Sequence, residues 1–136
     1  MTPSQLTRLS WIAQLVAAAT IGQTLYFKFT AHPDSVKLFT ELGMEPHGRL
    51  TVAVLELLAC ILLLTPRRAA YGALLAAGLM AGAIASHLTH LGWQGPRLHL
   101  GALALLALAC CLFTLMVRRR ELPFPKAPRP ANRHRG

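Results

Sequence analysis

The sequence has 136 residues, of which 54% are apolar and 14% are charged. The length fits one domain, and the low charged share argues against a water-exposed globular fold, because soluble domains average about 25% charged residues. The apolar residues are grouped in long runs, which predicts membrane spans. Much of the formal net charge of +9 lies in residues 118–136, which contain seven basic residues and one acidic residue.

Residues 1–8 are a short polar N-terminal segment, and residues 9–27 form the first predicted span, with Lys28 at its exit. A cleaved signal peptide is the competing interpretation. However, the apolar run is longer than the 7–15 residues of a signal-peptide core, and the sequence after it does not resemble a small-residue cleavage site. We therefore expect an uncleaved span. It also contains polar side chains, namely Gln14, Thr20, Gln23 and Thr24.

The longest internal connection covers residues 30–49. Residues 32–35 (HPDS) supply turn and cap chemistry, and Val36, Phe39 and Leu42 then follow at helical spacing until Gly43. This pattern predicts a short amphipathic helix at the membrane interface. A plain polar loop is the alternative.

Three further spans are predicted at residues 50–64, 69–91 and 98–117, separated by short connections. The second is near the lower length limit for crossing a bilayer, because only 17 residues separate Arg49 from Arg67. Together the elements predict an all-α fold, a transmembrane antiparallel four-helix bundle with a short interfacial helix after the first span. Residues 118–136 are rich in proline and basic residues, and we expect them to be a disordered tail.

Basic residues predict the orientation of the chain. They dominate residues 1–8, the turn at 65–68 and the tail, whereas the opposite side has basic residues offset by Asp34, Glu41 and Glu45. We therefore expect a multi-pass protein of the inner cell membrane with both termini in the cytoplasm. The tail lacks aromatic residues other than Phe124, which favours attraction to anionic lipid headgroups over nucleic-acid binding.

Small residues mark the expected helix contacts, because they permit close approach in lipid. Gly78 and Gly82 are four residues apart on the third span and continue as a stripe through Ser86 and His90. Ala18 and Gly22 form a similar pair on the first span. The helix-packing candidates are therefore Gly78, Gly82, Ala18 and Gly22.

Glu56 lies near the middle of the second span. A carboxylate at that depth costs several kcal/mol unless it is neutralised, paired or hydrated, so it is a candidate for function. A structural hydrogen bond is the alternative, with Gln14, Gln23, Thr20 or Ser86 as its partner. His87 and His90 lie on roughly one face of the third span. We expect a polar cluster rather than a metal site, and its candidates are Glu56, His87, His90, Ser86, Gln23 and Lys28. Interfacial histidines without a role are the alternative.

The three cysteines all lie within spans and are expected to act as small packing groups. The sequence contains no phosphate-binding glycine loop and no Ser/His/Asp or HExxH pattern. No catalytic residue is therefore assigned, and we expect that the chain is not an enzyme on its own.

Four sequence blocks together resemble the DoxX-like family of small membrane proteins: YFKF (26–29), LGMEP (42–46), VLELLACILLLTPR (54–67) and GLMAGAIASHLTHL (78–91). The resemblance covers residues 10–117. The positions that fit the family pattern are Lys28, Glu56, Pro66, Gly82, Ala83 and His87.

This resemblance implies a four-helix membrane bundle. Some members feed electrons into the quinone pool, one of them from thiosulfate, and others act in maturation or redox homeostasis. Three functions follow as alternatives: a redox accessory subunit with a quinone between Glu56 and His87, a small proton-coupled transporter, or an assembly protein without chemistry. The expected partners are the lipid bilayer and either a membrane protein or a second copy of the chain.

Overall fold

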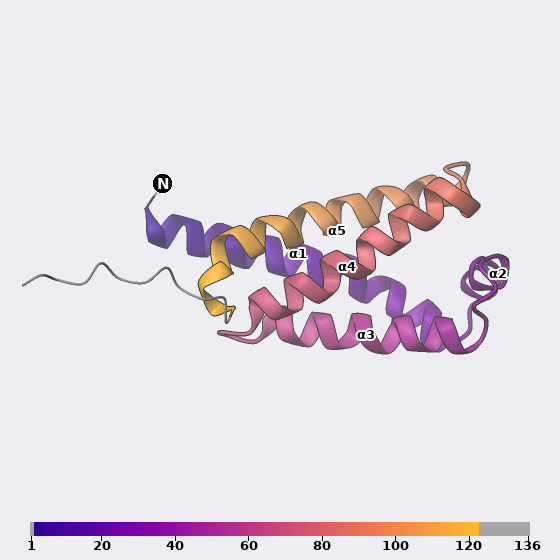
Figure 1. Ribbon diagram of the computed structural model, residues 1–136, viewed down its shortest axis with the longest axis horizontal. Coiled ribbons are helices and arrows are strands. Elements are labelled where there is room, and N and C mark those ends of the chain that lie inside the picture. Colours follow the sequence, from indigo (N-terminus) through magenta and orange to yellow (C-terminus); the bar gives the residue numbers. More distant parts are fainter. Residues whose placement is uncertain (1, 123–136) are drawn as a thin grey trace, which may run out of the picture.

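The computed structural model describes residues 2–122, which form helices and no strands (Figure 1). The predicted all-α fold class is confirmed. The elements are α1 (Pro3–Phe29), α2 (Pro33–Glu41), α3 (His47–Leu64), α4 (Ala69–Ser86), the π-helix η1 (His87–Leu91), α5 (Pro96–Arg118) and the 3-10 helix η2 (Arg119–Glu121).

Among the described residues, three helical stretches are long and apolar enough to cross a membrane: His47–Leu64, Ala69–Leu91 and Arg97–Glu121. They contain the second, third and fourth predicted spans. The helix that contains the first predicted span, α1, is not among them, and polar residues such as Gln14 and Gln23 lower its hydropathy.

Helix α1 begins at Pro3, inside the segment that the sequence assigned to a polar N-terminus. The reason is a capping box. The Thr2 hydroxyl accepts a hydrogen bond from the Gln5 backbone N–H (3.2 Å), and the Gln5 side chain accepts one from the Thr2 N–H (2.9 Å). These bonds satisfy amide groups that a helix start leaves open, and proline is well suited to the first helical position.

The four long helices pack side by side around a common interior, and α1 and α4 each contact both α3 and α5. The N-terminus, the turn between α3 and α4, and the end of α5 lie at one end of the molecule (Figure 1). Helix α2 and the connection between α4 and α5 lie at the other end. We call these the Arg67 end and the α2 end.

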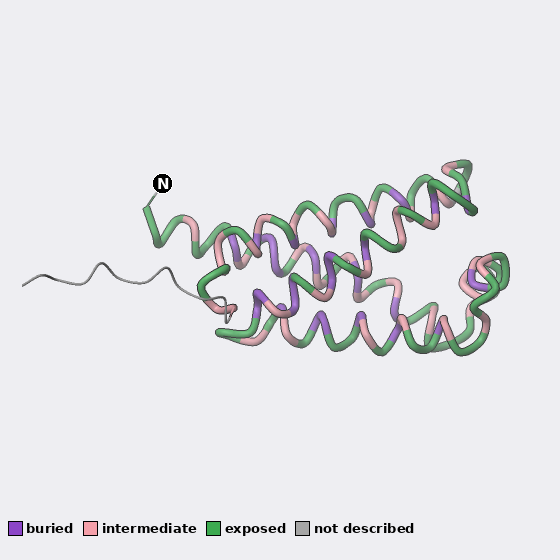
Figure 2. The backbone as a smooth tube through the Cα atoms, in the orientation of Figure 1, coloured by how far each residue is buried: buried purple, intermediate pink, exposed green. Residues whose placement is uncertain are grey.

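Buried positions recur along each long helix (Figure 2), and many of them are small residues, whereas many large apolar side chains are exposed. Ala17, Ala59 and Ala107 are completely buried, whereas Ile12 and Ile61 are 58% and 55% exposed. Helices in lipid gain nothing from burying large apolar groups, and small residues let their backbones approach closely. The distribution is therefore that of a protein whose outer surface faces hydrocarbon.

The close approach of α3 and α4 depends on Gly72. A Cβ atom there would lie 2.5 Å from the Leu63 backbone nitrogen and 2.8 Å from the Ala59 carbonyl oxygen. Gly78, Gly82 and Gly22 make no comparably close approach, because a Cβ at any of them would meet nothing within 4 Å, and their packing role stays a prediction. The remaining predicted packing residue, Ala18, does lie at a contact: its carbonyl oxygen is 3.8 Å from the sulfur atom of Cys60 on α3.

The Arg67 end is closed by a polar network. Arg118 donates a hydrogen bond to the buried Ser10 hydroxyl (3.1 Å), and its guanidinium lies over the Trp11 ring. The Glu121 carboxylate accepts a hydrogen bond from the Ala70 backbone N–H (3.1 Å). Residues 118–122, the start of the predicted tail, therefore pack against α1 and α4, and the rest of that tail lies outside the described residues.

Candidate functional site

A cavity of about 830 Å³ lies in the half of the molecule toward the α2 end. This volume is within the range of about 300–1,000 Å³ that is usual for small-molecule sites. Residues of α1, α2, α3, α4, η1 and α5 line it, and most of them are apolar. Its ionisable lining residues are Lys28, His32, Asp34, Glu56, His87 and His99.

Lys28 and Glu56 form an ion pair at the wall of this cavity. The Lys28 Nζ atom lies 2.8 Å from Glu56 Oε2, and the two side chains are 13% and 5% exposed. Lys28 also donates a hydrogen bond to the Thr24 hydroxyl (3.0 Å). Glu56 thus has a charged partner from α1 rather than any of the four polar partners considered from the sequence.

Arg49 fixes the position of the α1 terminus that carries Lys28. Its Nε atom lies 2.9 and 3.0 Å from the two carboxylate oxygens of Glu45. Its Nη1 group donates a hydrogen bond to the Lys28 carbonyl oxygen. Carbonyl groups at the end of a helix lack helical partners, so this bond both satisfies the terminus and ties it to the start of α3.

His87 enters the cavity wall where α4 changes into the π-helix η1, and short π-helical segments are frequent at functional sites. Its Nδ1 atom lies 3.0 Å from the Gly92 carbonyl oxygen. Since a carbonyl oxygen only accepts, this contact is a hydrogen bond when Nδ1 carries the proton. The neutral ring then has Nε2 free as an acceptor. The Trp93 ring packs beside His87, with ring centroids 5.3 Å apart.

Helix α2 covers the cavity, with Leu38 and the buried Phe39 among its lining residues. This confirms the predicted short helix. A bridge from Arg97 Nη2 to Glu41 Oε1 (2.5 Å) joins its end to α5, and Arg97 also donates to the Leu91 carbonyl oxygen (2.6 Å). The hydrogen bond from Arg97 lowers the pKa of the Glu41 carboxyl below its ordinary value of 4.5.

The cavity brings together five of the six predicted pocket residues: Glu56, His87, Ser86, Gln23 and Lys28. The Ser86 hydroxyl donates to the Gly82 carbonyl oxygen of its own helix (2.9 Å). His90 is the exception, because it is exposed, lies off the cavity wall and contacts the Thr89 hydroxyl through Nδ1 (2.7 Å). Within residues 2–122, no group of three His, Cys, Asp or Glu side chains is arranged to hold a metal ion.

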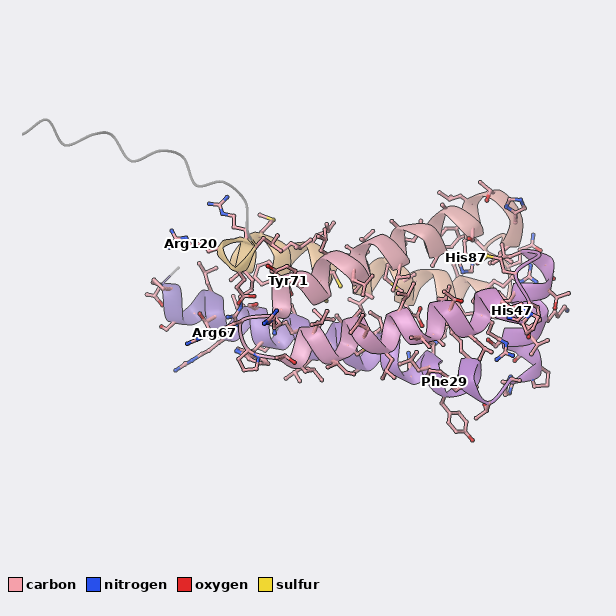
Figure 3. The ribbon with its side chains drawn as sticks, turned by 60° about the horizontal axis from the view of Figure 1, so that its bottom comes forward. Phe29, His47, Arg67, Tyr71, His87 and Arg120 are labelled. Carbon is pink, nitrogen blue, oxygen red and sulfur yellow. The ribbon has the colours of Figure 1, made fainter. Side chains whose placement is uncertain are left out.

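Figure 3 places His87 and His47 toward the α2 end, and Arg67 and Arg120 at the opposite end. Sequence reasoning missed the roles of Arg49 and Arg97, which fix the elements around the cavity. Arg49 follows Glu45 by four residues, a spacing that favours a helical ion pair and could have signalled its position. The bridge to Glu41 joins residues 56 positions apart and leaves no such local signal.

Comparisons with curated proteins and with solved structures find no match to the chain. A comparison with protein families matches residues 12–117 to the DoxX-like family. The matched region contains α3, α4, nearly all of α5 and the last two thirds of α1, together with every residue of the cavity wall. The protein is therefore a member of the DoxX-like family with helices suited to a membrane.

Proposed function

We propose that α1, α3, α4 and α5 cross the inner cell membrane as an antiparallel four-helix bundle, the membrane domain of residues 9–117. Short connections between α3, α4 and α5 support this arrangement. Although α1 carries more polar residues, Ile12 and Leu15 on it are 58% and 55% exposed, as expected for a lipid-facing surface. The excess of basic residues at the Arg67 end supports a cytoplasmic location for both termini.

Reporter fusions test this topology. Alkaline phosphatase, which is active only outside the cytoplasm, should be inactive when fused at Gly136 and active when fused within residues 92–95. A fluorescent reporter that folds in the cytoplasm should give the reverse pattern. Phosphatase activity at Gly136 would contradict the proposed orientation.

We further propose that the cavity binds a quinone and that the protein is a redox accessory subunit. The observation that carries this proposal is the Lys28–Glu56 ion pair in the wall of a largely apolar cavity. The apolar walls suit a quinone ring and its first isoprenoid unit. The Lys28 ammonium suits a quinone carbonyl oxygen as a hydrogen-bond donor.

Quinone reduction takes up two electrons and two protons. Glu56 and His87 are suited to hold and transfer protons at the ring oxygens, and the hydrogen bond to Gly92 orients the imidazole for this role. The sequence has no motif for haem, flavin or an iron–sulfur cluster. The electrons therefore come from a protein partner, and this chain supplies the quinone site.

Quinone binding to the purified protein tests the proposal. Titration of a short-chain ubiquinone into the wild type should give saturable binding. His87→Gln should weaken it about tenfold or more, the loss expected for a buried hydrogen bond. His90→Gln is the matched control, because the same change on an exposed residue off the cavity should alter the affinity less than about twofold. Equal effects of the two variants would contradict the assignment.

The Glu56→Gln variant distinguishes this function from the alternatives. Loss of quinone-linked activity with normal membrane insertion supports the quinone site. Loss of proton-coupled efflux of a lipophilic cation would instead identify a transporter. The cavity wall has only two Phe and no Tyr or Trp among its lining residues, which favours the quinone over an aromatic cation site. An unchanged phenotype would support an assembly protein.

A further inference from the structure

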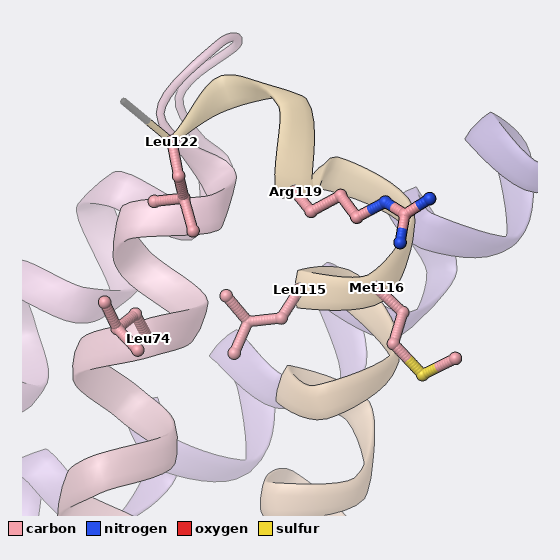
Figure 4. A pocket seen from close by; sticks show the side chains of 5 residues that line it. All are labelled: Leu74, Leu115, Met116, Arg119 and Leu122. Carbon is pink, nitrogen blue, oxygen red and sulfur yellow. The ribbon is translucent and has the colours of Figure 1, made fainter. Parts of the chain in front are cut away.

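A second pocket lies at the Arg67 end, between α4 and the end of α5, far along the helices from the cavity that α2 covers. Its volume is about 530 Å³, and it is lined by Leu74, Leu115, Met116, Arg119 and Leu122 (Figure 4). Leu74 and Met116 are 53% and 73% exposed, so the pocket is an open groove on the outer surface. It combines an apolar floor with one cation at its rim.

Three cations at the α2 end have partners within the protein, whereas Lys37 on α2 makes no side-chain hydrogen bond or ion pair to another described residue. Lys28 pairs with Glu56, Arg49 with the carboxylate four residues before it, and Arg97 with Glu41. These three ion pairs hold parts of the chain together, and a carboxylate of the protein neutralises each of the three cations.

The exposed arginines at the Arg67 end form a group without partners among the described residues. Arg67, Arg68, Arg119 and Arg120 make no side-chain hydrogen bond or ion pair to any other residue of the described chain. The acidic side chain at this end, Glu121, is already engaged by Arg118 and by a backbone N–H. Arg8 on α1 likewise has no such partner, so five guanidinium groups at this end are unpaired within residues 2–122, and Arg119 is the one that borders an apolar groove.

We propose that this groove binds one anionic phospholipid, with its phosphate at the Arg119 guanidinium and an acyl chain along Leu74, Leu115 and Met116. A guanidinium forms strong, directional hydrogen bonds with phosphate oxygens. The groove's apolar residues continue from the rim along α4 and α5, the direction that an acyl chain takes into a bilayer. Arg67, Arg68 and Arg120 at the same end add attraction to a negative headgroup. This site is separate from the quinone cavity and does not depend on it.

Native mass spectrometry of the full-length protein, delipidated in detergent, tests the proposal. Phosphatidylglycerol should bind as one tight molecule, and phosphatidylcholine with the same chains should bind at least about tenfold more weakly. Arg119→Gln should lower the affinity for phosphatidylglycerol about tenfold. Arg120→Gln removes the same charge outside the groove and should lower that affinity less than about threefold.

A groove-filling variant, Leu74→Trp, tests the apolar contact without changing the charge. It should reduce phosphatidylglycerol binding while circular dichroism shows unchanged helix content. Equal losses for Arg119→Gln and Arg120→Gln would show that only overall charge attracts the lipid, which overturns the site. Equal binding of the two lipids, or full binding to the Leu74→Trp variant, would overturn it as well. Binding of soluble glycerol phosphate as tight as that of the lipid would show that the groove contributes nothing, and would also overturn it.

Discussion

Separating the Lys28–Glu56 pair should reveal a strong energetic coupling. Lys28→Met leaves the Glu56 carboxylate in a wall where its side chain is only 5% exposed. Glu56→Gln leaves the ammonium, which is 13% exposed and still bonded to Thr24. In each single variant one charge remains at the edge of an apolar cavity without its counter-charge.

The burial and remaining hydrogen bonds of the two side chains indicate how much stability each variant should lose. Removing one member of a buried ion pair costs about 3–5 kcal/mol. We expect roughly 3 kcal/mol for Lys28→Met and roughly 2 kcal/mol for Glu56→Gln, since the ammonium is less buried and keeps its hydroxyl partner. The double variant removes both charges and should lose roughly 2 kcal/mol or less, well under the sum of the single losses.

Thermal unfolding in detergent, followed by the fluorescence of Trp11 and Trp93, measures the effect. A chain of this size shifts by roughly 3 °C per kcal/mol, so Lys28→Met should lower the Tm by about 10 °C. Asp34→Asn is the control, because that carboxylate is 91% exposed and its loss should cost less than about 0.5 kcal/mol. A double variant whose loss equals the sum of the single losses would refute the coupling.

Two further predictions concern the helices around the cavity. Gly72→Ala should destabilise the protein by about 1–3 kcal/mol, because its Cβ would press on the α3 backbone. Gly82→Ala has open space beside it and should be neutral or stabilising by up to about 1 kcal/mol. Equal losses of stability for the two variants in thermal unfolding would contradict the close packing at Gly72. The lowered pKa of Glu41 means that its bridge to Arg97 stabilises α2 above pH 4.5 and that this stabilisation is lost as the pH falls through the lower folded value. Hydrogen exchange of α2 should therefore quicken below that pH in the wild type relative to Glu41→Gln, after correction for the intrinsic rate, and an identical pH response in both proteins would exclude the bridge as its cause.

The fold could be predicted largely from the apolar runs, because each run is bounded by charges or turn residues that end a helix. The prediction of residues 69–91 as one helical stretch matches α4 and η1 together. Helix α1 extends beyond the first predicted span toward the N-terminus, because apolar runs give no information on a polar helix start. There Thr2 and Gln5, not hydrophobicity, determine where the helix begins.

The site was harder to predict because sequence spacing does not give the separation of residues on different helices. Glu56 and His87 were identified from their unusual positions in apolar segments, and both line the cavity. His90 was grouped with His87 on the assumption of α-helical geometry, whereas the chain is π-helical there. The glycine pair was assigned to packing, but a small residue can equally leave space, as Gly78 and Gly82 do beside the cavity.

The alanine-rich interior makes the two halves of the molecule unequal. The large cavity opens among the residues toward the α2 end, whereas Ala59, Ala73, Ala76 and Ala107 belong to a closely packed cluster outside its wall. A molecule in the cavity would consequently exchange protons through the α2 end rather than through the Arg67 end. In the proposed transmembrane arrangement the α2 end faces one side of the bilayer, so chemistry in the cavity would be tied to that side.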